Sequence, residues 1–352
     1  MSGPNLLLTR QNIHPQEEEW QLIEETNDAN FDSQFGYFLY PSSLNVKAQN
    51  FYNGKIIKRA VQPEFFSEFF SSEKKTKKGK LLKPDKQKYL ASVKKLQEHI
   101  QRGDIYEINY CVCYEIQETE VNPFETFLKL NSISEAPQAC LAYFDDCWII
   151  CSSPERFIKR IGEDLITQPI KGTARRSKDL KEDDKLKMEL SQSLKERTEN
   201  VMIVDVARND ISRIAEKGTV KVDELCGIYS FKQVHQMIST IRCKTGKDYT
   251  IEQIFDATFP MASMTGAPKI RAMQLIHEYE SFNRGFYSGS IGVIDKQNNF
   301  DFNVVIRSII YDEKNKSATI AVGSAITALS DAEKEWEECQ IKAAAMLSVL
   351  QN

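Results

Sequence analysis

Hydrophobic side chains recur along the chain at two spacings, and each spacing predicts one kind of element. Between Pro84 and Gly103 the apolar residues are separated by intervals of four, three and four; they are Tyr89, Val93, Leu96 and Ile100. These intervals place the four side chains on one helical face, and a glycine commonly ends a helix. The segment is therefore predicted to be an amphipathic helix that stops at Gly103.

The segment 105–116 alternates as a strand does, with one face formed by Tyr106, Ile108, Tyr110, Val112 and Tyr114. Further strands are predicted at 139–151, 156–161, 164–171, 286–295, 300–311 and 316–324. Further helices are predicted near 179–205, 251–257, 267–280 and 330–350. Groups of long antiparallel strands with helices between them favour an α+β fold over a doubly wound parallel sheet.

The chain divides by motif content near residue 82. Residues 1–72 carry few motifs, and a run rich in lysine follows at 74–80, which is typical of a solvated linker. We therefore expect an accessory segment at 1–82 and a main domain at 83–352.

Composition narrows the class of protein. Of the 352 residues 41% are hydrophobic and 27% charged, as in ordinary globular proteins. No apolar run approaches the roughly 20 residues that cross a bilayer, and the N-terminus lacks the apolar stretch of a signal peptide, so a cytoplasmic protein without membrane contacts is expected. A formal charge of −4 argues against a nucleic-acid partner. The eight cysteines form no Cys-x-x-Cys pair and the four histidines lie far apart, so a zinc site is not indicated.

Glu155 and Lys171 are the first candidates for chemistry. Both are predicted at strand ends beside a Pro or Gly, where a side chain is easily presented to a cleft. A buried lysine that loses its charge is a nucleophile, and a glutamate that stays protonated is a general acid. A single salt-bridged pair would explain the same residues without chemistry.

The helix predicted near 179–205 carries an acidic residue, Glu199, next to an apolar run. Its apolar stripe is predicted to be Leu186, Leu190, Leu194, Val201 and Val204. Because Glu199 lies off that stripe, its carboxylate is expected to be either exposed or held by a cation.

Pro268 fits the first turn of another helix, with Thr265 as its cap. Free backbone N–H groups at 263–267 would then be able to meet a carboxylate. In the last predicted helix, Glu335, Glu338 and Lys342 share one face. A surface ion pair is the usual meaning of the last two, although paired with Glu199 the residue Glu338 could also hold Mg²⁺.

Taken together and in this order, these segments resemble the chorismate-utilising enzymes, the family that includes anthranilate synthase, aminodeoxychorismate synthase, isochorismate synthase and salicylate synthase. The resemblance runs from Gln87 to Leu350. Its motifs are Gly103-Asp104-Ile105-Tyr106, Ser153-Pro154-Glu155-Arg156-Phe157, Met202-Ile203-Val204-Asp205, Arg208-Asn209-Asp210, Thr265-Gly266-Ala267-Pro268-Lys269 and Ile306-Arg307. It implies antiparallel sheets packed as a sandwich with helices outside, and a shortened N-terminal segment.

Two positions distinguish the branches of this family. Lys171, in Pro169-Ile170-Lys171-Gly172-Thr173, looks like the nucleophile of the aminodeoxychorismate synthases, where anthranilate synthases usually carry Ala. Glu107 stands where isochorismate and salicylate synthases place a water-activating Lys and where ammonia-using members usually have Gln. The resemblance therefore implies ammonia rather than water as the second nucleophile.

The activity so implied is a Mg²⁺-dependent amination of chorismate to 4-amino-4-deoxychorismate, on the route to p-aminobenzoate and folate. Lys171, as the free amine, would add at C2 of chorismate while Glu155 protonates the departing C4 hydroxyl, and ammonia would then expel the lysine. Glu199 and Glu338, with Glu335 as a third candidate, would hold the Mg²⁺. Arg307 would contact the enolpyruvyl carboxylate. The other implied substrate-binding residues are Tyr287, Ser263, Thr265, Gly266, Gly323, Ser324, Ala325, Lys342 and Gln236.

Some positions depart from the family pattern. Gln236 replaces a histidine of the site, and Ser324 and Ala325 alter a glycine-rich loop. A chorismate-binding subunit with impaired catalysis therefore stays an alternative, as do anthranilate synthase component I and isochorismate synthase. Since the chain shows no glutaminase motif, the expected partner is a separate glutamine amidotransferase subunit, component II, and a homodimer is a further candidate assembly.

Overall fold

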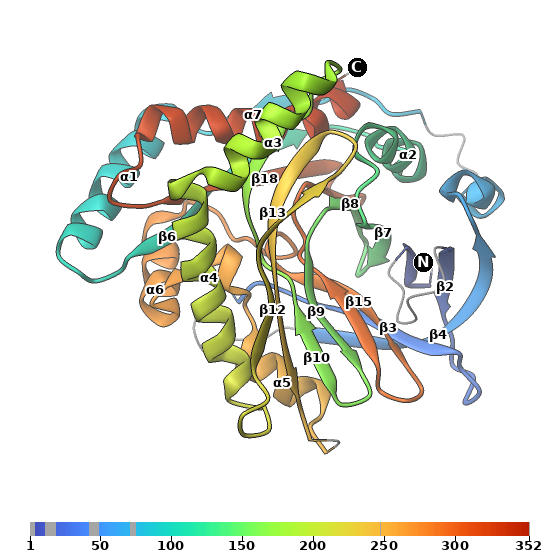
Figure 1. Ribbon diagram of the computed structural model, residues 1–352. Helices are drawn as coiled ribbons and strands as arrows, with labels where there is room; N and C mark the ends of the chain where they lie inside the picture. The colour runs from blue at the N-terminus through green and yellow to red at the C-terminus, as the bar shows by residue number, and fades with distance from the viewer. Residues whose placement is uncertain (1–3, 11–18, 42–48, 71–74, 247, 352) are drawn as a thin grey trace.

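The computed structural model describes residues 4–10, 19–41, 49–70, 75–246 and 248–351, and its strands form one hydrogen-bonded network (Figure 1). The first nine strands are β1 Leu6–Thr9, β2 Trp20–Glu25, β3 Ser33–Phe38, β4 Gln49–Ala60, β5 Lys80–Leu82, β6 Glu107–Gln117, β7 Gln138–Phe144, β8 Cys147–Ser153 and β9 Arg156–Ile161. The others are β10 Asp164–Thr167, β11 Ile170–Arg175, β12 Lys221–Ser230, β13 Val234–Lys244, β14 Gly266–Ala267, β15 Ser290–Asp295, β16 Phe300–Asn303, β17 Ser308–Asp312 and β18 Ser317–Ile326. Each described pairing is antiparallel.

The helices lie around the strands, which confirms the predicted α+β class. They are α1 Lys86–Gln101, α2 Pro123–Ser134, α3 Leu180–Gln192, α4 Leu194–Ser212, α5 Ile251–Thr258, α6 Lys269–Tyr279 and α7 Ala332–Gln351, with 3₁₀ turns η1 Pro63–Phe70 and η2 Ala262–Met264. In Figure 1, α1, α3 and α7 lie across one end of the strands, and α4 and α6 lie along one flank. Among the described residues, no helix is long and apolar enough to cross a membrane. The expected cellular location stays a prediction.

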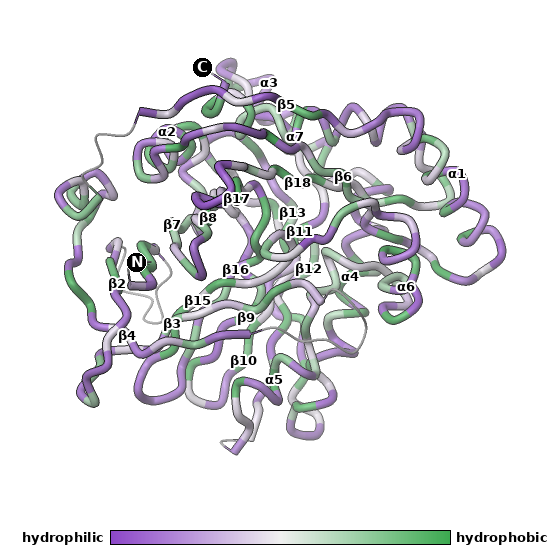
Figure 2. The backbone as a smooth tube through the Cα atoms, turned by 180° about the vertical axis from the view of Figure 1, so that it is seen from behind, coloured by the Kyte–Doolittle hydropathy of each residue, from purple (hydrophilic) through white to green (hydrophobic). Residues whose placement is uncertain are grey.

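Strand β6 separates the two larger hydrophobic cores. Its residues Ile108, Tyr110, Val112, Tyr114 and Ile116 pack with α1, α2 and α7. Cys111, on the opposite face, packs with α4, α5 and the strands around β9. The alternation predicted for 105–116 is confirmed from Ile108 to Tyr114, whereas Tyr106 is 65% exposed and precedes β6. In Figure 2 the strands through the middle of the molecule carry both hydrophobic and hydrophilic segments. Both faces of β6 therefore pack, and the face of Cys111 also carries the buried polar residues Glu107 and Asn109.

Strands from the first 82 residues pair with strands from the rest of the chain. β1 pairs with β7, β3 with β15 and β5 with β6. In the lysine run, the backbone of Lys77 bridges Glu120 and the side chain is exposed, while Lys74 lies outside the described residues. The division at residue 82 stays a prediction about domains, but the accessory segment shares the sheet of the main domain.

The helix predicted near 179–205 is two helices, α3 and α4, because the chain turns at Ser193. Its backbone is extended there, and its side chain accepts a hydrogen bond from the Glu196 backbone N–H, so a new helix, α4, begins. The break changes the helical phase, and the predicted stripe residues Leu194 and Val201 are 81% and 43% exposed. The face of α4 that is buried instead carries Glu199, Asn200, Ile203, Val204, Ala207, Asp210 and Ile211.

Three predicted strands are each two strands. The 139–151 segment turns at Asp145 and Asp146, both with positive φ, to form the hairpin of β7 and β8. The 164–171 segment divides into β10 and β11, and 300–311 into β16 and β17, the latter around Arg307 with φ of 52°. Helix α2 and the hairpin of β12 and β13 were not predicted. The divisions of the three predicted strands were missed because their turn positions are occupied by residues other than glycine.

Candidate active site

Lys171 and Glu107 form a buried ion pair at the centre of the predicted site. Lys171 Nζ donates to Glu107 Oε1 at 2.6 Å, and the side chains are 11% and 1% exposed. Glu107 is the first residue of β6 and pairs with Ala267 of β14, which fixes its backbone. Its second oxygen, Oε2, is buried and has no hydrogen-bond partner among the described residues. The lysine therefore meets a carboxylate with an unused acceptor atom.

A β-bulge directs Lys171 towards this carboxylate. β11 pairs with β13 at Ile170 and again at Thr173, with the register shifted between them, and Gly172 has φ of +95°. A bulge with a left-handed glycine re-aims the neighbouring side chain, and any Cβ at position 172 would be strained. Asn200 of α4 supports the bulge by donating to the Lys171 carbonyl at 3.4 Å. This contact was not predicted, since Asn200 reads as part of an ordinary helix.

The protonation of Lys171 differs from the expectation of a free amine. Burial acts to lower its pKa, but the charges of Glu107, Glu199 and Glu338 outweigh it and raise the pKa to about 12. The carboxylates predicted to hold metal are thus close enough to act on the lysine. In the ligand-free protein Lys171 is an ammonium, so attack on a substrate requires that its proton be accepted by another group.

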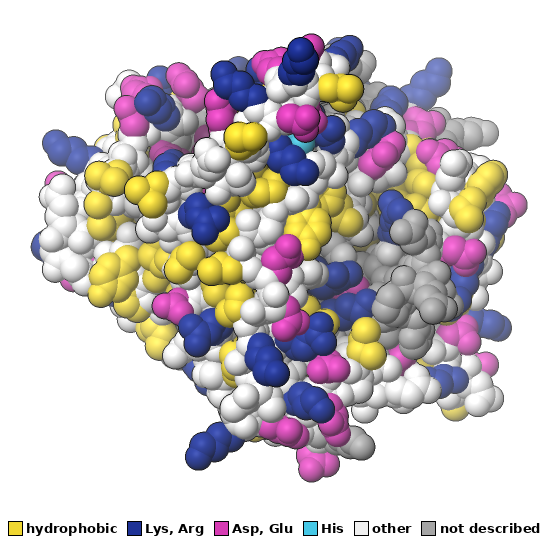
Figure 3. Space-filling model, in the orientation of Figure 1, with side chains coloured by type: hydrophobic (Ala, Val, Ile, Leu, Met, Phe, Trp, Pro, Cys, Tyr) yellow, Lys and Arg dark blue, Asp and Glu magenta, His cyan; other side chains and the backbone are white. Residues whose placement is uncertain are grey.

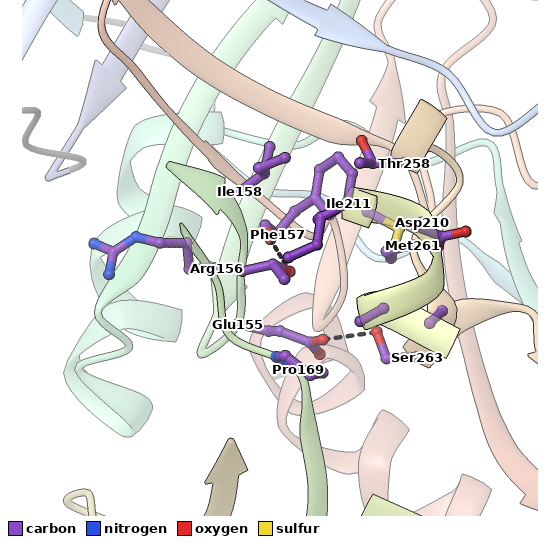
Figure 4. A pocket seen from close by; sticks show the side chains of 13 residues that line it. Glu155, Arg156, Phe157, Ile158, Pro169, Asp210, Ile211, Thr258, Met261 and Ser263 are labelled. Atoms are coloured by element: carbon purple, nitrogen blue, oxygen red, sulfur yellow. Dashed lines mark hydrogen bonds between the residues drawn. The ribbon is translucent and has the colours of Figure 1, made fainter. Parts of the chain in front are cut away.

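Glu155 lies in the connection between β8 and β9, where it is buried. Its Oε1 accepts a hydrogen bond from Ser263 Oγ of η2 at 2.7 Å (Figure 4). Burial raises the pKa of Glu155 to about 7, although the Ser263 hydrogen bond and the charge of Lys171 act to lower it. A carboxyl group with this pKa is partly protonated at neutral pH, as the predicted general acid requires.

Three carboxylates gather between α4 and α7. Lys195 Nζ lies 3.9 Å from Glu199 Oε1 and 3.7 Å from Glu335 Oε1, while Glu338 Oε1 pairs with Lys342 Nζ at 2.5 Å. Burial, opposed by Lys171 and reinforced by Glu107, raises the pKa of Glu199 to about 7; burial and Glu338 raise that of Glu335. Glu199 Oε1 is buried and has no hydrogen-bond partner in the described part of the chain. Crowded carboxylates with an unused oxygen fit a hard cation, although no three described metal-binding side chains are assembled as a metal centre.

Arg307 and Tyr287 lie near this group. The described residues offer no hydrogen-bond partner to the Arg307 guanidinium, whose pKa is lowered by burial against the opposing charges of Tyr287 and Glu338. Tyr287 is buried, and its hydroxyl lies 3.7 Å from Cys111 Sγ. A partly buried guanidinium with no hydrogen-bond partner among the described residues is suited to a carboxylate ligand.

The predicted glycine-rich loop is part of strand β18. Gly323, Ser324 and Ala325 pair in register with Cys111, Tyr110 and Asn109 of β6. Lys342 Nζ donates to the Gly323 carbonyl at 2.8 Å, and Ser324 Oγ contacts the Tyr89 hydroxyl at 3.0 Å. Pairing with β6 occupies one edge of this segment, which leaves fewer backbone amides for a ligand than a loop would.

The η2 segment also differs from the prediction. Thr265 caps no helix, because its hydroxyl donates to the Met261 and Ala262 carbonyls, and α6 begins without a side-chain cap. The backbone N–H of Thr265 donates to the Ala262 carbonyl, so this N–H is not free for a ligand. Gly266 lies against β6, where a Cβ would come 2.2 Å from the Glu107 carbonyl. Gln236 is buried on β13, and its Oε1 has no described partner.

A second buried ion pair was missed. Lys269 Nζ, at the start of α6, donates to Asp210 Oδ2 at 2.5 Å and to the Thr258 carbonyl at 3.0 Å. Both residues occur in motifs noted in the sequence, but 59 positions separate them. Asp210, near the end of α4, is buried.

The sequence profile of the family described as chorismate binding enzyme matches residues 18–348, so the chain belongs to that family. A rice protein named probable aminodeoxychorismate synthase, chloroplastic, is 37% identical over 80% of this chain and 32% of its own length. Aminodeoxychorismate synthase component 1 of Escherichia coli is 36% identical over 72% of this chain and 55% of its own. A relative from Aquifex aeolicus, 34% identical over 76% of this chain and 53% of its own length, is named anthranilate synthase component 1. The chain thus spans about a third to about half of these curated relatives.

The solved structure of the menaquinone-specific isochorismate synthase MenF of Escherichia coli has the same fold. The TM-score is 0.81 with 17% identity, and the match covers 99% of this chain and 88% of that one. The predicted chorismate-binding fold is therefore confirmed.

Proposed function

We propose that the protein is a component I of aminodeoxychorismate synthase, which aminates chorismate at C4 to 4-amino-4-deoxychorismate. The observation that carries this proposal is the contact between Lys171 Nζ and Glu107 Oε1, which joins a buried amine to a proton acceptor inside the family's site. The naming of relatives as aminodeoxychorismate synthases supports the same reaction. A water-using mechanism is disfavoured because the position of Glu107 carries no lysine.

We assign the proton transfers and the first nucleophilic attack to side chains of this protein. Glu107 accepts a proton from Lys171, whose free amine adds at C2 of chorismate. Glu155 donates its proton to the C4 hydroxyl, which leaves as water. Ammonia then forms the new bond at C4, and the bond between C2 and the Lys171 nitrogen breaks with its electron pair returning to the lysine. Arg307 holds the enolpyruvyl carboxylate through charge-assisted hydrogen bonds.

Glu199 and Glu338, with Glu335 beside them, are the residues that would hold Mg²⁺, which supplies positive charge to bind the ring carboxylate. The unused buried Glu199 Oε1 supports this assignment. Glu338→Gln is expected to weaken Mg²⁺ binding about tenfold or more in a calorimetric titration. Unchanged binding would remove Glu338 from the metal site.

The ammonia would come from a glutamine amidotransferase subunit. The name component 1 of the Escherichia coli relative supports a partner of this kind. The test incubates the protein with chorismate, MgCl₂ and ammonium chloride, and identifies the product by mass spectrometry. 4-Amino-4-deoxychorismate without pyruvate release is expected; anthranilate with pyruvate release, or binding of chorismate without turnover, would overturn the proposal.

A further inference from the structure

A small cavity lies directly behind Glu155. Its volume is about 20 Å³, which is sufficient for one water-sized molecule. Figure 4 shows Glu155 and Ser263 at one end of it and Thr258 at the other, with Phe157 and Ile211 between them. The cavity thus connects the predicted general acid to the region where α4 and α5 meet.

An open groove lies on the other side of α4, between this helix and the start of α6. Its volume is about 700 Å³, and Arg208, Ser212 and Ile270 are among its lining residues. In Figure 3, exposed hydrophobic side chains gather over α4 and α6. The groove exposes one side of α4 to solvent, whereas the small cavity lies on the buried side of the same helix.

Asp210 belongs to the walls of both spaces. On the groove side, Lys269 Nζ is held by Asp210 Oδ2 at 2.5 Å and by the Thr258 carbonyl at 3.0 Å. Thr258 is itself a wall residue of the cavity. The lysine ammonium therefore occupies a seat of two oxygens at the boundary between groove and cavity.

We propose that this boundary is the access route of ammonium: the ion replaces the Lys269 amine in the seat formed by Asp210 and Thr258, then moves into the cavity beside Glu155. The inference rests on the proposed amination. It assigns to the Asp210 and Lys269 pair a role in substrate passage in addition to its role in the fold.

The chemistry of the seat and the size of the cavity both fit this ligand. A carboxylate and a carbonyl that hold one –NH₃⁺ group present the acceptors that NH₄⁺ needs. Ammonia is about the size of the water molecule that the cavity can contain.

Glu155 both gives and regains one proton in the proposed reaction. After Glu155 has given its proton to the leaving hydroxyl, its carboxylate takes a proton from NH₄⁺ in the cavity. The lone pair of the resulting NH₃ forms the bond at C4, and the bond from C2 to Lys171 breaks. Chorismate and ammonium thus give the amine and water, and Glu155 ends protonated.

The first test fills the cavity from α4. Ala207 is buried and lines the cavity, whereas Ala257 lies on α5 outside its lining, so Ala207→Leu is compared with the control Ala257→Leu. Ala207→Leu is expected to raise the KM for ammonium about tenfold or more, with chorismate binding and ammonium-independent formation of the Lys171 adduct unchanged. An unchanged KM for ammonium in a folded Ala207→Leu protein would overturn the cavity as the waiting site.

The second test removes the Lys269 amine from the seat formed by Asp210 and the Thr258 carbonyl. In Lys269→Ala, ammonium chloride is expected to raise the Tm by about 2 °C or more beyond tetramethylammonium chloride, whereas the parent protein shows no such difference. Equal effects of the two salts on Lys269→Ala would overturn the seat. Both readouts differ from failure of the proposed function, which would appear as the absence of a Lys171 adduct and of aminated product in the parent protein.

Discussion

Lys171 and Lys269 each reach a buried carboxylate, at 2.6 Å from Glu107 Oε1 and 2.5 Å from Asp210 Oδ2. Burial acts on both amines in the same direction. Yet the pKa of Lys171 is raised to about 12, because Glu199 and Glu338 add their charges to that of Glu107. The pKa of Lys269 is lowered, because burial opposes a single carboxylate and Arg213 repels the amine.

The difference teaches that pair geometry alone does not determine the charge state of a buried lysine. The number of further charges within a few ångströms determines it, because a poorly screened interior transmits them. At Lys171 the surplus of carboxylates favours the protonated amine. At Lys269 burial and the charge of Arg213 outweigh the single carboxylate.

The largest expected difference between Lys171 and Lys269 is in kcat after either amine is removed. Lys171→Ala is expected to reduce kcat by about 10⁴-fold or more, because no other amine can form the adduct at C2. Lys269→Ala, assayed at saturating ammonium, should keep kcat within about tenfold of the parent value. Steady-state assays with mass-spectrometric detection of the adduct measure both; comparable losses in the two variants would break the comparison.

The next largest effect is expected on the free energy of unfolding when the ion pair of Lys269 and Asp210 is broken. Lys269→Met leaves Asp210 buried without its cation, which should lower the free energy of unfolding by about 3–5 kcal/mol in urea titrations. Replacing both members, in Asp210→Leu with Lys269→Met, should recover most of this loss. If the double variant is no more stable than Lys269→Met, the loss comes from packing and not from the unpaired charge.

Glu155 is a buried acid without a direct ion pair. It therefore shows how burial changes the pKa of a group that has no paired charge. Its pKa in the folded protein, about 7, lies above its ordinary value of 4.5, so its contribution to stability is present below pH 4.5 and is lost as the pH rises through 7. Glu155→Gln should therefore raise the free energy of unfolding by roughly 2–3 kcal/mol at pH 8 and change it little at pH 4.5. Urea midpoints at the two pH values test this, and an equal shift at both would contradict it.

The smallest expected effect concerns the hydrogen bond from Ser263. It stabilises the ionised form of Glu155, so Ser263→Ala should raise the pKa of this acid further, by about one unit. Because the protonated acid is the active form, the alkaline limb of the pH profile of kcat should move to higher pH. Thr167→Val, at another residue lining the cavity, is the control; a limb that stays in place in Ser263→Ala would show that Glu155 is not the group observed.

Local patterns predicted the elements that depend on local causes. Helix α1 follows from its apolar spacing and Gly103, and β6 from its alternation. The break at Ser193 was missed because a serine is compatible with both a helix interior and a helix cap. The turn at Asp145 and Asp146 was missed because neither residue requires a left-handed backbone.

The sequence by itself determined the family of the protein and singled out Lys171, Glu155 and Glu199, because these depend on residue identity in ordered motifs. Only the tertiary structure decided that Lys171 meets Glu107, 64 positions away, and that Asp210 meets Lys269 between a groove and a cavity. The physical reason is that charge acts through space: spacing along the chain carries no information about which carboxylates surround a buried amine, and those carboxylates determine its proton.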